Sequence, residues 1–366
     1  MSSINEENSL TIKQQTVFFT SSESMQEIRD DSIDVIVTSP PYNRGKNYAS
    51  DADKKYDDNK PESVYIEFLE KVWTECLRVA SNNCVFFLNI GDSANDQGIS
   101  ELVANSAESV GWIRIQDIIW VKSIYGKGHY TPSGRNKRLN NVWEHIFMFV
   151  KNKSTYSLNP KAVGIPYADK SNIGRYSKND LRDPGNVFHI CYEKTTGAKI
   201  KKGHDAPFPI GLPYTCIKLV EGVKRVLDPF LGTGTTLAAA NALGKRGFGY
   251  EKFPKKKLIE KTIIAGKDYS VETDILIPHY ESSISTLLNI INRKGNINPP
   301  TTKKEEIEYY ILMDTLLKMN IRTDIVDELR RYIPEEYLSK ASWHAKSQKN
   351  DKSKQNLDQY ILSSEE

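Results

Sequence analysis

The feature that most constrains the fold is a series of continuous apolar runs, rich in β-branched and aromatic residues, in the first two-thirds of the chain. Runs without polar alternation are typical of strands that are buried on both faces of a sheet. Segments with helical spacing, at residues 64–79 and 99–110, lie between such runs, as the crossovers of a parallel sheet require. We therefore predict an α/β fold with a doubly wound, mostly parallel sheet. The predicted strands are residues 34–38, 84–89, 115–121, 145–150, 224–228 and 246–251.

The character of the sequence changes twice after the first strands. Residues 151–183 are polar and contain proline and glycine, which indicates an insertion. Beyond residue 268, an apolar repeat with helical spacing includes Tyr309 and Met313. We predict a main domain at residues 1–268 with insertions around 122–141 and 151–183, a small C-terminal helical appendage at 269–345, and a disordered polar tail at 346–366.

Composition disfavours several classes of protein. The 366 residues are 39% hydrophobic and 27% charged, with a net charge of +3, which is ordinary for a globular chain. No apolar run approaches ~18 residues and no signal peptide precedes Ser9, so we expect neither membrane insertion nor secretion. The four cysteines form no CxxC pair, which indicates reduced, buried thiols of a cytoplasmic protein and no metal site.

A glycine-rich segment, DPFLGTGTT at residues 228–236, follows a predicted strand and precedes a helical pattern. Gly232 and Gly234 allow a tight turn with close approach of a ligand to the backbone, and the helix start presents free N–H groups. The segment lacks the lysine of a P-loop, and Leu237 stands where the nicotinamide fingerprint has glycine or alanine. Fifteen residues after the segment, Glu251 ends a strand, where its carboxylate can accept hydrogen bonds from both ribose hydroxyls. Together these residues predict a nucleoside site.

A proline-rich segment, SPPY at residues 39–42, follows the first predicted strand. This position lies at the carboxyl edge of the sheet, where α/β proteins bind ligands. Pro40 and Pro41 donate no N–H and restrict the backbone, so their loop is stiff and its carbonyls can accept. The Ser39 hydroxyl and the Pro40 carbonyl can accept from an exocyclic amine, and the Tyr42 ring can stack on a base. A rigid turn that merely closes the strand is the alternative interpretation.

Both segments resemble the motifs of the amino-methylating DNA methyltransferases, which use S-adenosylmethionine. The catalytic motif of that family is (Asp/Asn/Ser)-Pro-Pro-(Tyr/Phe), here residues 39–42, and its cofactor motif is Asp-Pro-Phe-x-Gly-x-Gly-Thr, here residues 228–235. The catalytic motif comes first, which is the order of the beta subgroup. The resemblance covers residues 30–265 and implies a Rossmann-like methyltransferase sheet. The cofactor contacts that it implies are Asp228, Pro229, Phe230, Gly232, Gly234, Thr235 and Glu251, with His204, Phe208 and Pro209 beside the methionine end.

The resemblance also implies a mechanism. The target base flips out of the duplex into the site. Its amine would be bound by Ser39 and the Pro40 carbonyl, in a loop that Pro41 stiffens, while Tyr42 stacks on the ring. The nitrogen then takes the sulfonium methyl in line, so orientation and electrostatics supply most of the acceleration. In this family Ser at the first motif position accompanies cytosine N4 more often than adenine N6, so Ser39 predicts cytosine N4 methylation.

Other activities agree less well with the residues. Adenine N6 methylation is the main alternative, because both bases present an amine beside a ring-nitrogen acceptor. Ring-carbon methylation of cytosine needs a cysteine nucleophile, typically after proline, and no cysteine here follows proline. Glutamine methylation in proteins prefers Asn to Ser39 and places the cofactor motif first. An RNA substrate stays open, and a catalytically silent DNA-binding subunit is disfavoured because its motifs would be broken.

Basic residues between the predicted strands are the candidates for DNA contact, because Arg and Asn pair well with guanine and adenine edges. These candidates are Lys122, Arg135, Lys137, Arg138 and Asn140. The resemblance implies double-stranded DNA as the partner and a restriction–modification system with a cognate endonuclease. It also implies a location at the nucleoid of a bacterial or archaeal cell. The appendage lies outside the resemblance and could bind DNA, a partner nuclease or a second copy of the chain in a homodimer.

Overall fold

The chain divides into two units in the computed structural model, Met1–Ile277 and Pro278–Glu366. In the second unit, Tyr309 and Met313 are helical and buried. Most of the predicted appendage and the tail at 346–366 lie outside the described residues. The structure describes residues 8–43, 59–92, 97–122, 141–165, 167, 170–175, 181–190, 208–253, 255–269, 299, 309, 313 and 330–332.

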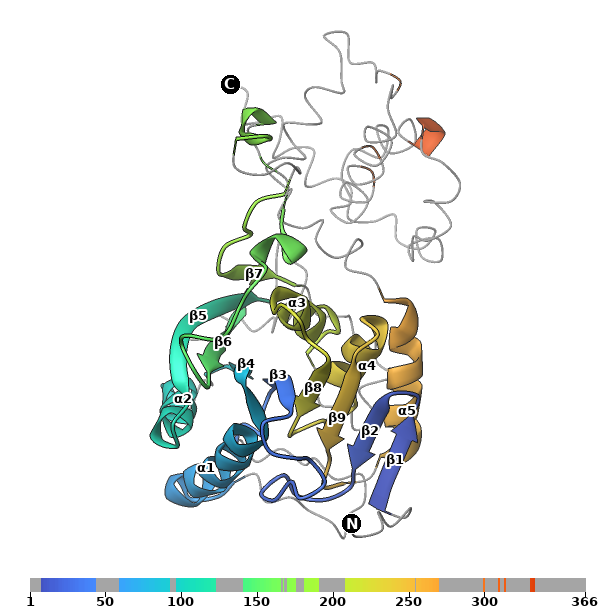
Figure 1. Ribbon diagram of the computed structural model, residues 1–366. Helices are drawn as coiled ribbons and strands as arrows, with labels where there is room; N and C mark the ends of the chain where they lie inside the picture. Colours follow the sequence, from blue (N-terminus) through green and yellow to red (C-terminus); the bar gives the residue numbers. More distant parts are fainter. Residues whose placement is uncertain are drawn as a thin grey trace, which may run out of the picture. The chain divides into compact units, whose positions relative to one another are not determined.

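A nine-stranded sheet forms the centre of the first unit, in the order β1-β2-β9-β8-β3-β4-β6-β5-β7 (Figure 1). Neighbours from β2 to β4 are parallel, as are β5 and β7, whereas β1–β2, β4–β6 and β6–β5 are antiparallel. The predicted α/β class and mostly parallel sheet are confirmed. The strands are β1 (Ser9–Ile12), β2 (Gln15–Phe18), β3 (Ile33–Thr38), β4 (Ala80–Ile90), β5 (Ile113–Val121), β6 (Trp143–Val150), β7 (Val187–His189), β8 (Arg225–Asp228) and β9 (Arg246–Tyr250).

Three of these strands go beyond the sequence prediction. Strands β1 and β2 form a short N-terminal hairpin whose turn contains Lys13 at a φ of 54°. Strand β7 has three residues and, among the described strands, pairs with β5 alone at the end of the sheet. Short strands of this kind carry too few apolar residues to signal themselves, because pairing with an existing edge decides their conformation.

Helices cover both faces of the sheet, as the buried runs predicted (Figure 1). Helices α1 (Glu62–Val79) and α2 (Ile99–Ser109) pack on one face. Helices α3 (Gly211–Leu219), α4 (Thr235–Ala242) and α5 (Lys256–Ala265) pack on the other. Strand β3 serves both cores, because Ile36 joins the α1–α2 cluster while Val35 and Val37 join the opposite one. Strand alternation therefore buries both of its faces.

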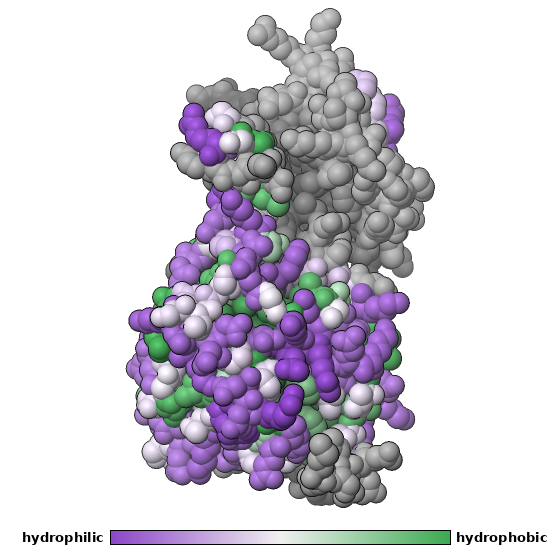
Figure 2. All heavy atoms as spheres, in the orientation of Figure 1, coloured by the Kyte–Doolittle hydropathy of each residue, from purple (hydrophilic) through white to green (hydrophobic). Residues whose placement is uncertain are grey.

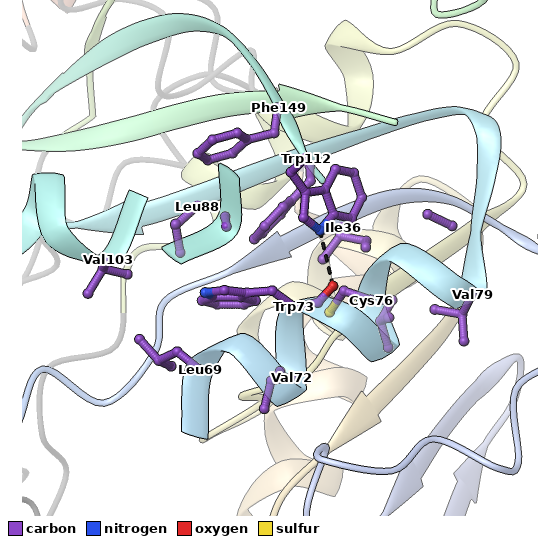
Figure 3. Close-up of a cluster of buried hydrophobic side chains, with 14 of the residues drawn as sticks. Ile36, Leu69, Val72, Trp73, Cys76, Val79, Leu88, Val103, Trp112 and Phe149 are labelled. Atoms are coloured by element: carbon purple, nitrogen blue, oxygen red, sulfur yellow. Dashed lines mark hydrogen bonds between the residues drawn. The ribbon is translucent and has the colours of Figure 1, made fainter. Parts of the chain in front are cut away.

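Tryptophans tie the α1–α2 layer to the sheet (Figure 3). The Trp73 indole N–H donates to the Ser106 hydroxyl at 3.0 Å, which joins α1 to α2. The Trp112 indole N–H donates to the Trp73 carbonyl at 3.1 Å (Figure 3). Both indoles are buried with their N–H groups satisfied, so this layer gives the site a rigid support.

The first part of the predicted insertion at residues 151–183 is bound to the core. The Asn159 N–H donates to the Leu219 carbonyl at 2.7 Å, and Val163 is buried in the cluster that contains α3. The first residues of the insertion therefore pack along α3. The later residues of the insertion lie partly outside the described residues.

Hydrophilic side chains cover most of the described surface of the first unit on the face seen in Figure 2. No helix in the described part of the chain is long and apolar enough to cross a membrane. Cys76, Cys84 and Cys216 are buried and free, as predicted, and Cys191 lies outside the described residues.

Candidate active site

The two sequence motifs meet at the carboxyl ends of neighbouring strands. Strands β3 and β8 are parallel, so Thr38 and Asp228 end them at the same edge. The Thr38 hydroxyl donates to the Asp228 carboxylate at 2.6 Å, across 190 residues of sequence. Ser39, the next residue, therefore begins its loop directly beside the glycine-rich turn.

Asp228 is a buried carboxylate that organises this turn. Besides the bond from Thr38, it accepts hydrogen bonds from the Thr236 hydroxyl at 2.6 Å and from the Phe230 N–H at 3.0 Å. Burial raises the pKa of Asp228 from 3.8 to about 6, although the three hydrogen bonds oppose the rise. The carboxylate holds the start of α4 and the end of β3 in one arrangement.

The turn itself depends on glycine. Gly232 and Gly234 have φ angles of 56° and 94°, a region that side chains rarely adopt. A Cβ on Gly234 would lie 3.3 Å from the Ile259 side chain of α5, whereas a Cβ on Gly232 would meet only the Phe230 carbonyl, at 4.0 Å. Helix α4 begins at Thr235 with no side-chain cap, so its first N–H groups can bind a ligand.

Glu251 follows β9, the other neighbour of β8, and lies at the same edge. Its N–H donates to the Phe18 carbonyl at 3.0 Å, and its carboxylate accepts from the Phe253 N–H at 2.9 Å. Burial raises the pKa of Glu251 to about 7, against the backbone hydrogen bonds and the positive charge of Lys255. Two carboxylates thus flank the glycine turn from adjacent strands.

The other predicted cofactor residues that the structure describes lie in two places, next to Asp228 in the turn and directly before α3. Pro229 is buried. The Phe230 ring contacts the Trp73 ring of α1 edge-on, with the two ring centroids 5.9 Å apart. Phe208 is partly buried and Pro209 is buried immediately before α3. His204 lies outside the described residues.

The SPPY loop is held by hydrogen bonds on both sides. The Tyr65 hydroxyl of α1 donates to the Pro41 carbonyl at 2.6 Å. The Asn43 side chain, at a φ of 52°, exchanges two hydrogen bonds of 2.8 Å with the Lys60 backbone. Within the described part of the chain, the Pro40 carbonyl accepts no hydrogen bond. The loop is thus rigid, with an acceptor available at the sheet edge.

Two polar residues at this edge have no role in the sequence analysis. Glu144, at the start of β6, is 7% exposed and accepts from the Tyr42 hydroxyl and from the Asn89 amide, each at 3.1 Å. Tyr42 in turn accepts from the Ser39 hydroxyl at 3.1 Å. The available signal was a glutamate beside the apolar run of WEHIFMFV and an asparagine inside the apolar run that ends ASNNCVFFLNI.

Lys122 lies in a different environment from the one its basic segment suggests. It is 8% exposed, and its ammonium donates to the Glu144 carboxylate at 2.7 Å. A buried, paired ammonium is a poor phosphate contact, so its place in the structure favours a role inside the site over the predicted DNA contact. The other DNA-binding candidates lie outside the described residues: Arg135, Lys137, Arg138 and Asn140.

A doubly wound sheet with a glycine turn and acidic residues at adjacent strand ends defines a nucleoside-binding α/β domain. The family model N6_N4_Mtase, described as DNA methylase, matches residues 33–261 of this domain. The chain therefore belongs to the DNA methylase family.

Several characterised proteins are similar to the chain. The type II methyltransferase M.MjaI of Methanocaldococcus jannaschii is 29% identical over 299 residues, which cover 70% of this chain and 95% of the relative. The type II methyltransferase M.MthZI of Methanothermobacter thermautotrophicus is 25% identical, with 88% and 91% covered. Among solved structures, the cytosine-N4-specific PvuII DNA methyltransferase matches with a TM-score of 0.52 and 19% identity. That match covers 72% of this chain and 90% of PvuII methyltransferase, and it shows the shared fold.

Proposed function

We propose that this DNA methyltransferase transfers a methyl group from S-adenosylmethionine to the N4 amine of a flipped cytosine at a specific site in double-stranded DNA. The observation that carries the proposal is the hydrogen bond between Thr38 and Asp228. It joins the loop that can bind an amine to the turn that can bind a nucleoside, which is the juxtaposition that direct methyl transfer needs.

The glycine turn and its two carboxylates are the cofactor site. Glu251, in its ionised form, accepts hydrogen bonds from the ribose hydroxyls, and Gly232 leaves space for the backbone to approach the cofactor. S-adenosylmethionine supplies the electrophilic methyl when it is bound. Asp228 acts on the shape of the turn, because its carboxylate oxygens accept from Thr38, Thr236 and the Phe230 N–H.

The SPPY loop is the target site. The Ser39 hydroxyl and the Pro40 carbonyl accept from the amine, which draws the nitrogen toward tetrahedral geometry as its lone pair attacks. The Tyr42 ring stacks on the base, an interaction of about 1–3 kcal/mol. Because the Tyr65 hydroxyl and the Asn43 side chain already hold the loop, little reorganisation precedes the reaction.

Ser39 supports cytosine N4 over adenine N6 as the target. The name of PvuII methyltransferase states cytosine N4 specificity for a protein of the same fold. Adenine N6 is the second candidate, because the loop presents acceptors that suit the amine of either base.

Mass spectrometry of nucleosides tests the function and the base. Genomic DNA would be isolated from a methylation-free host that expresses the wild type, S39A or S81A. Ser81 serves as the matched control. It hydrogen-bonds Asn83 at the amino end of β4, away from the carboxyl ends of the strands where the site lies. N4-methylcytosine in the wild type and S81A but not in S39A is the expected result. N6-methyladenine would overturn the choice of base, and no methylated amine would overturn the function.

The type II names of the relatives support a place in a restriction–modification system, with a cognate endonuclease that cleaves unmodified sites. Protection of a plasmid against such an endonuclease would test this role. For DNA binding, Arg135→Ala or Arg138→Ala should weaken duplex binding far more than cofactor binding. Equal loss of both would indicate misfolding instead.

A further inference from the structure

A hydrogen-bonded chain leads from the target loop to a buried ion pair. Ser39 Oγ donates to the Tyr42 hydroxyl at 3.1 Å, and the Tyr42 hydroxyl donates to Glu144 Oε2 at 3.1 Å. The other carboxylate oxygen, Oε1, accepts from Lys122 Nζ at 2.7 Å. Asn89 Nδ2 also donates to Oε2, at 3.1 Å. Tyr42, Lys122 and Asn89, the described residues that hydrogen-bond this carboxylate, all donate to it.

The direction of these bonds follows from the chemistry of the terminal group. An ionised carboxylate has no proton to give, so the Tyr42 hydroxyl must donate to it. The lone pairs of the Tyr42 oxygen then accept the Ser39 proton. The lone pairs of Ser39 Oγ are left to accept from whatever enters the site. The buried charge thereby decides whether Ser39 meets the substrate as a donor or as an acceptor.

Close packing against Gly91 restricts the Glu144 side chain on the side of β4. A Cβ on Gly91 would lie 2.5 Å from Glu144 Cγ and 3.0 Å from Cδ, so the side chain already fills the space beside β4. Asn89 holds the strand of Glu144 as well, because its amide also donates to the His145 carbonyl at 3.0 Å. The acceptor is therefore fixed before any substrate binds.

We propose that Glu144, held by Lys122, is a positioning residue that fixes the polarity of the Tyr42–Ser39 hydroxyl chain and makes the site select bases that carry an exocyclic amine. A base with a carbonyl at the same position would need a proton donated by Ser39. In this arrangement Ser39 donates its proton to Tyr42, so it cannot donate to such a base. The inference rests on the proposed function, because it assumes that Ser39 contacts the target base.

Glu144→Gln is the informative substitution, because it keeps the shape and removes the charge. The Lys122 ammonium holds the amide oxygen on its side, so the amide NH₂ faces Tyr42 and Asn89. Tyr42 must then accept, and its proton turns toward Ser39. The chain reverses, and Ser39 presents a proton to an incoming amine.

The experiment measures single-turnover methyl transfer to duplex DNA by the wild type, E144Q, Y42F and the double variant, all as full chains. We expect E144Q to lower the rate by about tenfold to a hundredfold, the range of a hydrogen bond to a charged group. Affinity for S-adenosylmethionine should stay within about twofold. Because Y42F removes the link but keeps the ring, adding E144Q to Y42F should have little further effect.

A second readout separates polarity from a structural role. Duplexes that carry the target base or its carbonyl analogue, uracil for cytosine or hypoxanthine for adenine, are compared for binding to each variant. The affinity for the target-base duplex divided by the affinity for the analogue duplex should be lower in E144Q than in the wild type. The analogue also weakens base pairing in the duplex, but this effect is the same for both proteins and cancels in the comparison. Gly91→Ala, which displaces Glu144 without removing its charge, should lower the transfer rate in the same direction as E144Q.

Each outcome distinguishes the inference from the function beneath it. An active wild type with an unchanged rate in E144Q, additive effects of E144Q and Y42F, or an unchanged affinity ratio would overturn the role of Glu144 alone. A wild type that methylates no DNA would overturn the proposed function and the inference with it. Thermal unfolding midpoints within about 3 °C of the wild type would show that the variants are folded.

Discussion

Asp228→Asn should reduce the dependence of stability on pH, because Asp228 is a fully buried carboxyl with a raised pKa. Since the folded-state pKa of about 6 lies above the ordinary value of 3.8, the folded protein binds this proton more tightly than the unfolded chain. The contribution of Asp228 to stability is present in full below pH 3.8 and is lost as the pH rises through 6. The wild type therefore becomes less stable in this range.

The size of the effect follows from the two pKa values. At 1.36 kcal/mol per pH unit, the difference between 3.8 and about 6 corresponds to about 3 kcal/mol, of which about 2 kcal/mol falls between pH 4 and 8. Asparagine removes the charge but keeps an acceptor for Thr38 and the Phe230 N–H. Thr236 can accept from the new amide and donate to the Val37 carbonyl, which lies 3.5 Å from its hydroxyl.

Urea unfolding at a series of pH values measures this difference. Tryptophan fluorescence reports the transition, since Trp73 and Trp112 are buried in the same unit. The free energy of unfolding of D228N, relative to the wild type, should increase by about 2 kcal/mol from pH 4 to pH 8. The carboxyl resonance that disappears in D228N should titrate near pH 6 in the wild type. A constant difference across this range, together with a titration near pH 4, would refute the reasoning.

Three further substitutions have defined outcomes. Tyr65→Phe removes the 2.6 Å bond to the Pro41 carbonyl and should slow methyl transfer about threefold to tenfold, with cofactor affinity unchanged in equilibrium binding. Because the pKa of Glu251 is raised to about 7, cofactor affinity should increase as the pH rises through 7, and titration calorimetry should find this dependence absent in Glu251→Gln. Gly234→Ala should lower the free energy of unfolding in urea by about 1–3 kcal/mol, because φ is 94° and the Ile259 side chain is close. A decrease below about 0.5 kcal/mol would contradict that account.

Sequence reasoning succeeded where a residue type has a local physical cause. The buried runs located β3, β4, β5, β6, β8 and β9 because continuous apolar sequence is needed on a sheet covered by helices on both faces. Gly232 and Gly234 indicated a tight turn before α4, and the structure has a turn there in which both residues adopt positive φ. Strands β1, β2 and β7 escaped prediction because their conformation comes from pairing rather than composition.

Lys122 and Glu144 mark the limit of that reasoning. In the sequence, Lys122 is one of several cations near a polar segment, and its charge suggests a surface. In the structure, the antiparallel pairing of β5 with β6 places Trp120 opposite Glu144 and brings the two charges together just beyond β5. Register between strands is a long-range property, and a local pattern cannot reveal which partner a side chain meets.

The sequence by itself determined the α/β class, the two motifs and the expectation that each lies at a carboxyl end of a strand, because periodicity, proline and glycine act locally. Only the tertiary structure decided that β3 and β8 are neighbours, so that Thr38 bonds Asp228 across 190 residues. It also decided that the buried Glu144 accepts a hydrogen bond from Tyr42, which in turn accepts one from Ser39. Strand order and register are set by the packing of the whole sheet, and that packing converts two separate motifs into one site.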